Sequence, residues 1–217
     1  MNKIIMTTEE TLGGNIENLV ISNKETHLNI NKNTYIKNLT LNVKEFNLTF
    51  HIQEKVSFHF ESILKLQDVK GVIHLNLEDK TDVYFGLGIK SSLENRLDIL
   101  TTLQGSHTNC EVKVRLVGKE KSKMMMQLTG SLLSNTVDNN FTEDVKYLFA
   151  EDAYIEVLPE LLVASNDTLA NHNMSVGKMS EEELFYLESK GLKAQEAQEI
   201  YREGFIESVK KERSSYE

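Results

Sequence analysis

Histidine and cysteine are the residues of this 217-residue chain whose side chains are best suited to metal binding or proton transfer. The six histidines show neither the HExxH spacing nor another paired spacing that is typical of metal ligands. The single cysteine, Cys110, excludes an intrachain disulfide and a metal site built from several cysteines. We interpret Cys110 and five of the histidines as structural residues. His172 is the exception, because it lies in a polar segment, 166–178, that we expect to connect the last strand to the first helix.

Motifs that are typical of enzymes are absent from the sequence. Gly86-Leu87-Gly88 lacks the third glycine, the lysine and the following helix of a phosphate-binding loop, and no Gly-x-Ser-x-Gly nucleophile elbow occurs. The net charge of −9 weighs against a surface for nucleic acid or anionic lipid, because both need clustered Lys and Arg. We therefore expect a protein that is not an enzyme and that binds neither nucleic acid nor a membrane.

The compartment is indicated by what the sequence lacks. No apolar run reaches the roughly 18 residues that a membrane span requires. The N-terminus turns acidic at Glu9-Glu10, unlike a signal peptide. With only one cysteine, this pattern favours a reducing cytoplasm.

Short β-like runs fill residues 15 to about 165. Many alternate apolar and polar side chains, and the clearest is Val72-Ile73-His74-Leu75-Asn76-Leu77. No helix-length amphipathic stretch separates these runs, so alternating βαβ folds are not expected. The connections are polar and rich in asparagine, which suits the corners of a β-solenoid. Periodicity alone leaves a solenoid and a sandwich equally open.

The pattern becomes helical from about residue 179. Ser180 and Glu183 form the signature of a capping box, and Lys190-Gly191 is a typical helix end. A second helix is predicted from Lys193 to Arg213, with one apolar stripe that recurs every three or four residues. We expect this helical pair to cap the end of the β domain. Its aromatic residues could also be presented to a partner.

Five stretches in the C-terminal part of the chain form an ordered pattern over about 50 residues: Pro159–Val163, His172–Met179, Glu182–Leu192, Glu196–Ala197 and Gly204–Ile206. Within it, His172 follows Pro159 by 13 residues. In order and spacing these stretches resemble the C-terminal region of the SufB/SufD family, which are scaffold proteins of iron–sulfur cluster assembly.

The resemblance implies a mainly β protein: a right-handed parallel β-helix over residues 1–176, followed by a C-terminal helical domain over residues 177–217. It implies that the helical domain docks on a SufC-like ABC ATPase, and that only this partner binds ATP. Two such scaffolds, SufB with SufD or two copies of one protein, pair through their β-helices, so a dimer is expected. The residues that would lie in or under the ATPase-docking element are Glu183, Phe185, Tyr186, Gly191, Tyr201 and Phe205.

Two departures from the family pattern bear on the chemistry. SufB-like proteins carry a cysteine 28 residues before the histidine, where this chain has Asp144, and a glutamate after it, where this chain has Asn173. A carboxylate is a poor replacement for the thiolate that iron and sulfur prefer. The chain therefore looks closer to SufD, with His172, Asp144 and Asn173 as candidates at the cluster-assembly interface and His172 as the candidate metal ligand.

The resemblance predicts no stably bound cofactor and at most a transient iron–sulfur cluster. The main hypothesis is a SufD-like scaffold subunit that binds a SufC-like ATPase and pairs with a SufB-like or identical subunit. The alternative is a truncated, non-catalytic homologue that binds the ATPase without assembling a cluster. The absent cysteine supports this alternative.

Overall fold

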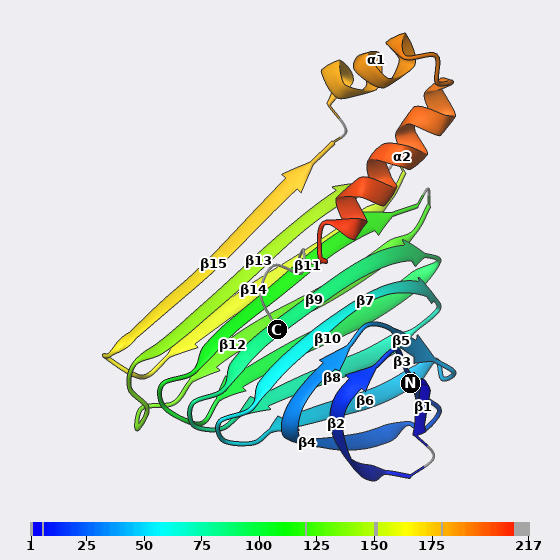
Figure 1. Cartoon of the computed structure of the whole chain (residues 1–217). Helices are drawn as coiled ribbons and strands as arrows, with labels where there is room; N and C mark the ends of the chain where they lie inside the picture. Colours follow the sequence, from blue (N-terminus) through cyan, green and yellow to red (C-terminus); the bar gives the residue numbers. More distant parts are fainter. Residues whose placement is uncertain (1, 6, 120, 150–151, 179, 211–217) are drawn as a thin grey trace.

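The computed structural model describes residues 2–5, 7–119, 121–149, 152–178 and 180–210. It contains fifteen strands followed by two helices (Figure 1). The elements are β1 (Asn2–Ile5), β2 (Glu9–Ile16), β3 (Asn18–Ile21), β4 (Glu25–Ile36), β5 (Leu39–Leu41), β6 (Glu45–Ile52), β7 (Ser57–Gln67), β8 (Lys70–Leu77), β9 (Asp82–Ser92), β10 (Glu94–Leu103), β11 (Asn109–Gly118), β12 (Lys123–Leu132), β13 (Asn139–Phe149), β14 (Tyr154–Val163), β15 (Thr168–Gly177), α1 (Glu181–Ser189) and α2 (Ala194–Glu207).

Twelve of the strands form one parallel sheet that wraps into a solenoid. Along the chain, strands alternate between two faces, with β6, β8, β10, β12 and β14 on one face and β7, β9, β11, β13 and β15 on the other. Strand β4 joins the faces, because residues 25–30 pair with β6 and residues 34–36 pair with β7. All pairings described are parallel, so the β-helix is confirmed and the sandwich is excluded.

The core fills the space between the two faces. In β8 the predicted alternation is confirmed, since Ile73, Leu75 and Leu77 are fully buried while His74 lies on the outer surface. Phe60 and Phe85 stack at 4.5 Å between ring centroids on neighbouring coils. Such stacked apolar rows are the main source of stability in a solenoid, because each coil buries its inner side chains against the next.

The two helices begin and end where local chemistry dictates. The Ser180 side chain accepts a hydrogen bond from the Glu183 backbone N–H at 3.4 Å, as the capping signature predicts. Gly191 has φ +95°, a left-handed conformation that glycine adopts without strain, and it ends the first helical segment. Helix α2 ends at Glu207, earlier than the predicted Arg213, which lies outside the described residues. Within the described chain, neither helix is long and apolar enough to cross a membrane.

Helix α2 lies on the side of the β-helix, whereas the sequence predicted a cap on its end. Its last turn packs on β9 and β11 (Figure 1). There the buried Ile206 packs with Val117 and Leu148. Gly86 and Gly88, the two glycines of the Gly86-Leu87-Gly88 segment, leave space for α2 and the residues that follow it. A Cβ on Gly86 would lie 2.6 Å from the Val209 carbonyl oxygen, and one on Gly88 would lie 2.7 Å from Ile206 Cγ2. The prediction of an end cap is therefore wrong.

Two polar contacts fix α2 in this position. The Tyr84 hydroxyl donates a hydrogen bond to the Val209 carbonyl, and Lys90 forms an ion pair with Glu203. Helix α1 packs against α2 and projects beyond the β-helix (Figure 1). As a result the open end of the solenoid, formed by β14 and β15, stays uncovered by the described helices.

Candidate functional site

His172 lies in the middle of the last strand, β15, and not in a connector as the polar sequence suggested. The strand pairs along its whole length with β13, so backbone hydrogen bonding to the preceding coil overrides the weak β-propensity of residues 168–177. All side chains of β15 are at least partly exposed, because no further coil covers them. The strand therefore presents His172 to solvent at the end of the solenoid.

The sequence predicted that His172, Asp144 and Asn173 share one candidate site, but the register of β13 and β15 puts them on different surfaces. Asp144 pairs with Asn173, while His172 pairs with Glu143. Phe141 and Val145 of β13 are buried in the core, so Glu143 between them faces the inner surface and Asp144 faces outward. Because paired positions in a parallel sheet share a face, His172 lies on the inner surface with Glu143, and Asn173 lies on the outer surface with Asp144.

Asp144 is held by a buried arginine on the outer surface. The Arg115 side chain is 5% exposed and forms an ion pair with the Asp144 carboxylate, and it also donates to the Asp144 carbonyl at 3.0 Å. An arginine buried in this way needs its counter-charge. Asp144 is therefore engaged in a structural ion pair and cannot substitute for the family's cysteine as a metal ligand.

Glu143 is the site residue that sequence reasoning missed. Its side chain lies in the core with 1% exposure, and Oε2 has no hydrogen-bond partner among the residues that the structure describes. Burial raises the pKa of this carboxyl from 4.5 to about 7. The alternation Phe141, Glu143, Val145 could have revealed it, since that pattern places a glutamate on the apolar side of a strand.

Cys110 lies on the same inner surface, on β11. It is a free, buried thiol, as the sequence interpretation predicted. Its strand neighbour Val112 is the register partner of Glu143 in β13. Burial, reinforced by the nearby Glu143 carboxylate, raises the pKa of the Cys110 thiol far above its ordinary value. The thiol therefore stays protonated at neutral pH and is a poor metal ligand in this position.

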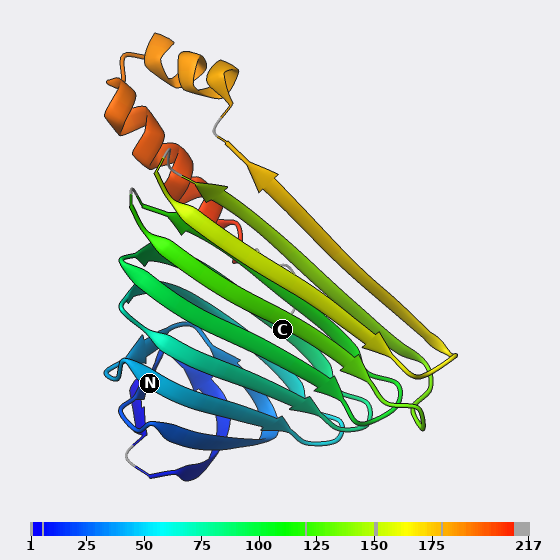
Figure 2. The same cartoon turned by 180° about the vertical axis from the view of Figure 1, so that it is seen from behind.

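The open end of the solenoid exposes apolar side chains of the last coil. Strands β14 and β15 are the two outer strands of the sheet, so each leaves one backbone edge without a strand partner among the described residues (Figure 2). Such an edge is a template for strand pairing with another chain. Large hydrophobic side chains are exposed on both surfaces of these strands. Val163, Met174 and Val176 lie on the inner surface, and Tyr154, Leu158, Leu162 and Leu169 lie on the outer surface.

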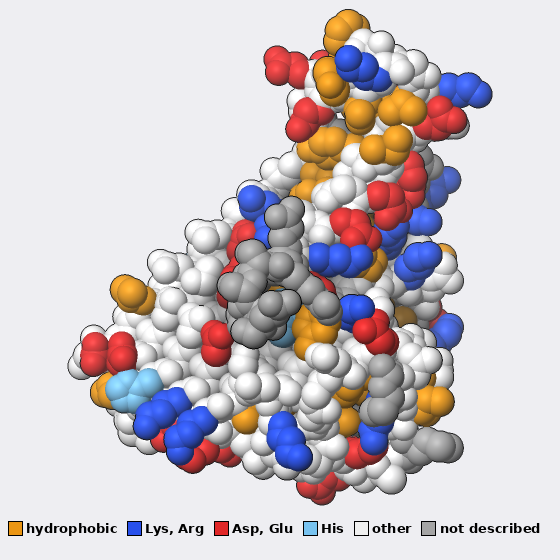
Figure 3. Space-filling model, viewed as in Figure 1, with side chains coloured by type: hydrophobic (Ala, Val, Ile, Leu, Met, Phe, Trp, Pro, Cys, Tyr) orange, Lys and Arg blue, Asp and Glu red, His pale blue; other side chains and the backbone are white. Residues whose placement is uncertain are grey.

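The helical pair carries a second apolar surface. Phe185 and Tyr186 of α1 are 73% and 60% exposed, and hydrophobic side chains gather over both helices (Figure 3). A groove of about 360 Å³ opens between the helices, lined by Glu182, Glu183, Tyr186, Leu187 and Tyr201. Exposed aromatics beside a groove are typical of a protein-binding surface.

Of the other residues predicted to dock the ATPase, Tyr201 lines the groove, whereas Phe205 and Gly191 do not. The Tyr201 hydroxyl is hydrogen-bonded to Glu183, and partial burial together with this bond raises its pKa. Phe205 packs toward the β-helix with Ile206, and Gly191 forms the turn between the helices. Glu183, Tyr186 and Tyr201 thus line the groove, Phe185 is exposed on the same helix, and Phe205 and Gly191 lie outside its lining.

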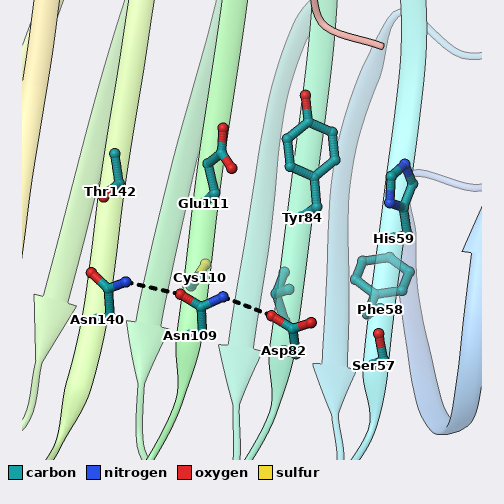
Figure 4. Close-up of a pocket in the computed structure, with 11 residues that line it drawn as sticks. Ser57, Phe58, His59, Asp82, Tyr84, Asn109, Cys110, Glu111, Asn140 and Thr142 are labelled. Atoms are coloured by element: carbon teal, nitrogen blue, oxygen red, sulfur yellow. Dashed lines mark hydrogen bonds between the residues drawn. The ribbon is translucent and has the colours of Figure 1, made fainter. Parts of the chain in front are cut away.

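A polar pocket of about 270 Å³ lies on the outer surface of β7, β9, β11 and β13 (Figure 4). Asn140 donates to Asn109 at 3.0 Å, and Asn109 donates to Asp82 at 2.7 Å. His59, Tyr84 and Glu111 stand in the next row along the same strands. The amide ladder repeats from coil to coil, so it acts as a structural stack that joins neighbouring coils.

Among the described residues, no group of three or more His, Cys, Asp or Glu side chains is placed to hold a metal ion. A metal bound by the described residues of one chain would therefore rely on fewer protein donors, with water or a second subunit completing the coordination. Glu143 and His172, register partners on the inner surface at the open end, form one pair that could contribute two donors.

The fold and these surfaces define a class of protein: a parallel β-helix with an open apolar end and a helical pair that extends from its side. Residues 94–205, just over half of the chain, match the family model described as the SufBD core domain of SUF system FeS cluster assembly. The chain therefore belongs to the SufB/SufD family of iron–sulfur cluster assembly proteins.

Curated relatives carry the same family name. An iron–sulfur cluster assembly SufBD family protein of Methanothermobacter thermautotrophicus is 30% identical over 105 residues, which is 48% of this chain and 25% of that protein. One of Pyrococcus horikoshii is 35% identical over 65 residues, or 30% of this chain and 15% of that protein. The matched part thus spans a quarter or less of these relatives' length.

Proposed function

We propose that this chain is a SufD-like scaffold subunit of an iron–sulfur cluster assembly complex. The observation that carries the proposal is the exposed aromatic surface of α1 and α2, Phe185 and Tyr186 beside the groove that Tyr201 lines. In the proposal a SufC-like ABC ATPase covers this surface and supplies the ATP-dependent step. The separation of α1 from the β-helix gives such a partner room to bind.

The open end of the β-helix is proposed as the pairing surface. A SufB-like subunit or a second copy of this chain would continue the ladder beyond β14 and β15 and bury the exposed inner-surface side chains Val163, Met174 and Val176. The position of α2 on the side of the solenoid supports this arrangement, because it leaves the end accessible. His172 would then lie at the junction between the two subunits, next to the cluster being assembled.

The test is co-expression with the SufC-like ATPase of the same host, followed by size-exclusion chromatography. The unsubstituted chain is expected to co-elute with the ATPase, and Phe185→Asp and Tyr201→Asp are each expected to abolish co-elution. Leu93→Asp is the matched control, since Leu93 is 63% exposed but lies on the β-helix between β9 and β10. Absence of co-elution by the unsubstituted chain, or an equal loss in the control, would contradict the proposal.

A second candidate function is supported by the engagement of Asp144 with Arg115. In this alternative the chain binds the ATPase but assembles no cluster, because the position of the family's cysteine is occupied by a structural ion pair. Anaerobic reconstitution of the purified complex with iron and sulfide separates the two. Visible absorption of an iron–sulfur cluster supports the scaffold, and an intact complex without that absorption supports the alternative.

A further inference from the structure

We infer that Glu143 and His172 together bind a single divalent transition-metal ion at the open end of the β-helix. The two residues are register partners on neighbouring strands, β13 and β15. Adjacent strands lie about 4.8 Å apart and paired side chains share a face. A carboxylate oxygen and an imidazole nitrogen on such a pair can therefore both reach one ion at the usual ligand distance of about 2.1 Å.

The burial of Glu143 is the observation that points to a ligand. The side chain is 1% exposed, Oε2 lacks a hydrogen-bond partner among the described residues, and none of the ion pairs in this part of the chain involves Glu143. A buried carboxylate is costly unless it is paired with a cation or coordinates a metal. The inner row around it, Val112, Phe141 and Val145, offers no cation.

His172 supplies the accessible half of the pair. It is exposed on the inner surface of the last coil, so an ion can enter from solvent at the open end. The ion would lie between the exposed imidazole and the buried carboxylate. It would replace the water that the carboxylate loses as a hydrogen-bond partner on burial. A subunit paired at this end, or water, completes the coordination, because one chain provides no third ligand among its described residues.

The donor set identifies the class of ion. One nitrogen and one carboxylate oxygen suit Fe(II), Zn(II), Mn(II) and similar ions, and without a thiolate they are poorly suited to a cluster held by soft ligands. The inference deepens the proposed function and rests on it only for the identity of the bound ion. Within an assembly scaffold, the site would hold a ferrous ion before sulfide arrives. The Glu143 side chain takes the place in the site that the sequence assigned to Asp144.

The test uses Co(II) as the probe, added to the purified, metal-free 217-residue chain and followed by equilibrium dialysis and visible absorption. We expect saturable binding that is weakened at least about tenfold by Glu143→Gln and by His172→Gln. His107→Gln is the matched control, because His107 is also an exposed histidine beside a carboxylate, with Nδ1 2.9 Å from Asp138. This control is expected to bind Co(II) as tightly as the unsubstituted chain.

Unchanged binding in both Glu143→Gln and His172→Gln, an equal loss in His107→Gln, or no binding by the unsubstituted chain would overturn the inference. Circular dichroism verifies folding of each variant, and His172→Gln tests the site independently of any change in the core, since His172 lies on the surface. The two proposals fail separately. Co-elution with the ATPase without Co(II) binding overturns only this inference, whereas Co(II) binding without co-elution overturns only the proposed function.

Discussion

Replacing Glu143 with glutamine should stabilise the metal-free protein, and the gain should depend on pH. The carboxyl is buried in an apolar row of the core, and its pKa is raised from 4.5 to about 7 by burial. A pKa difference of this size between the folded and unfolded states corresponds to about 3 kcal/mol of folding free energy. Glutamine has nearly the same shape and carries no charge, so it removes this penalty without leaving a cavity.

The pH window follows from the sign of the pKa shift. Below pH 4.5 the carboxyl is protonated in both states, and burial of Glu143 carries no charge penalty. Between pH 4.5 and about 7 the unfolded chain releases the proton while the folded chain keeps it, so folding stability falls as pH rises. Above about pH 7 the folded state must also hold the charged form, and the penalty reaches its full size.

Urea unfolding of both proteins between pH 4 and 8, in the presence of a chelator, measures this difference. The free energy of unfolding of Glu143→Gln should exceed that of the unsubstituted chain by little at pH 4.5 and by about 3 kcal/mol at pH 8. The titratable side chains nearest Glu143 on the inner surface are His172 and Cys110. The series is therefore repeated in a His172→Gln background, which removes the neighbouring imidazole. A difference that stays constant with pH would refute the argument from burial.

Two further predictions concern the outer surface. Asp144→Ala leaves the buried Arg115 without its carboxylate, so the free energy of unfolding measured in urea should fall by about 3 kcal/mol. Adding Arg115→Met to the same chain should restore most of that stability. A loss below about 1 kcal/mol would contradict a buried ion pair. Gly88→Val forces a side chain against Ile206, so α2 should detach from the β-helix and residues 181–207 should become sensitive to limited proteolysis. An unchanged cleavage pattern would contradict the packing of α2 on β9.

The strands could be predicted from the sequence because each coil repeats the same inside–outside alternation. Ile73 and Leu75 are buried and His74 lies outside, as a period of two requires. The capping of α1 was equally local, since Ser180 and Glu183 are neighbours along the chain. The path of α2 was not predictable in this way. It depends on Gly86 and Gly88, which are distant in sequence and clear a surface for the helix.

The candidate site shows why the register of a solenoid cannot be inferred from alternation alone. Paired residues lie 25 apart at Glu45 and Lys70 but 31 apart at Asn109 and Asn140, because the turns differ in length. At the last coil the spacing is 29, so His172 pairs with Glu143, and Asp144, at a spacing of 28, falls on the opposite face. A shift of one residue exchanges the two faces of a strand. For this reason Asp144, the predicted partner of His172, lies on the opposite surface from His172.

The same geometry indicates where in this fold an inner side chain can reach a ligand. The inner surface of a solenoid is closed by the next coil, and a polar side chain there is expensive unless it finds a partner. Glu143 lies one coil from the end, where only β15 follows it, and His172 lies on β15 itself. These are the positions from which an inner side chain can meet a ligand or a second subunit. An end cap formed by the helices would close that surface. Helix α2 instead packs on β9 and β11, so the described helices leave both their aromatic surface and the open end with Glu143 and His172 uncovered.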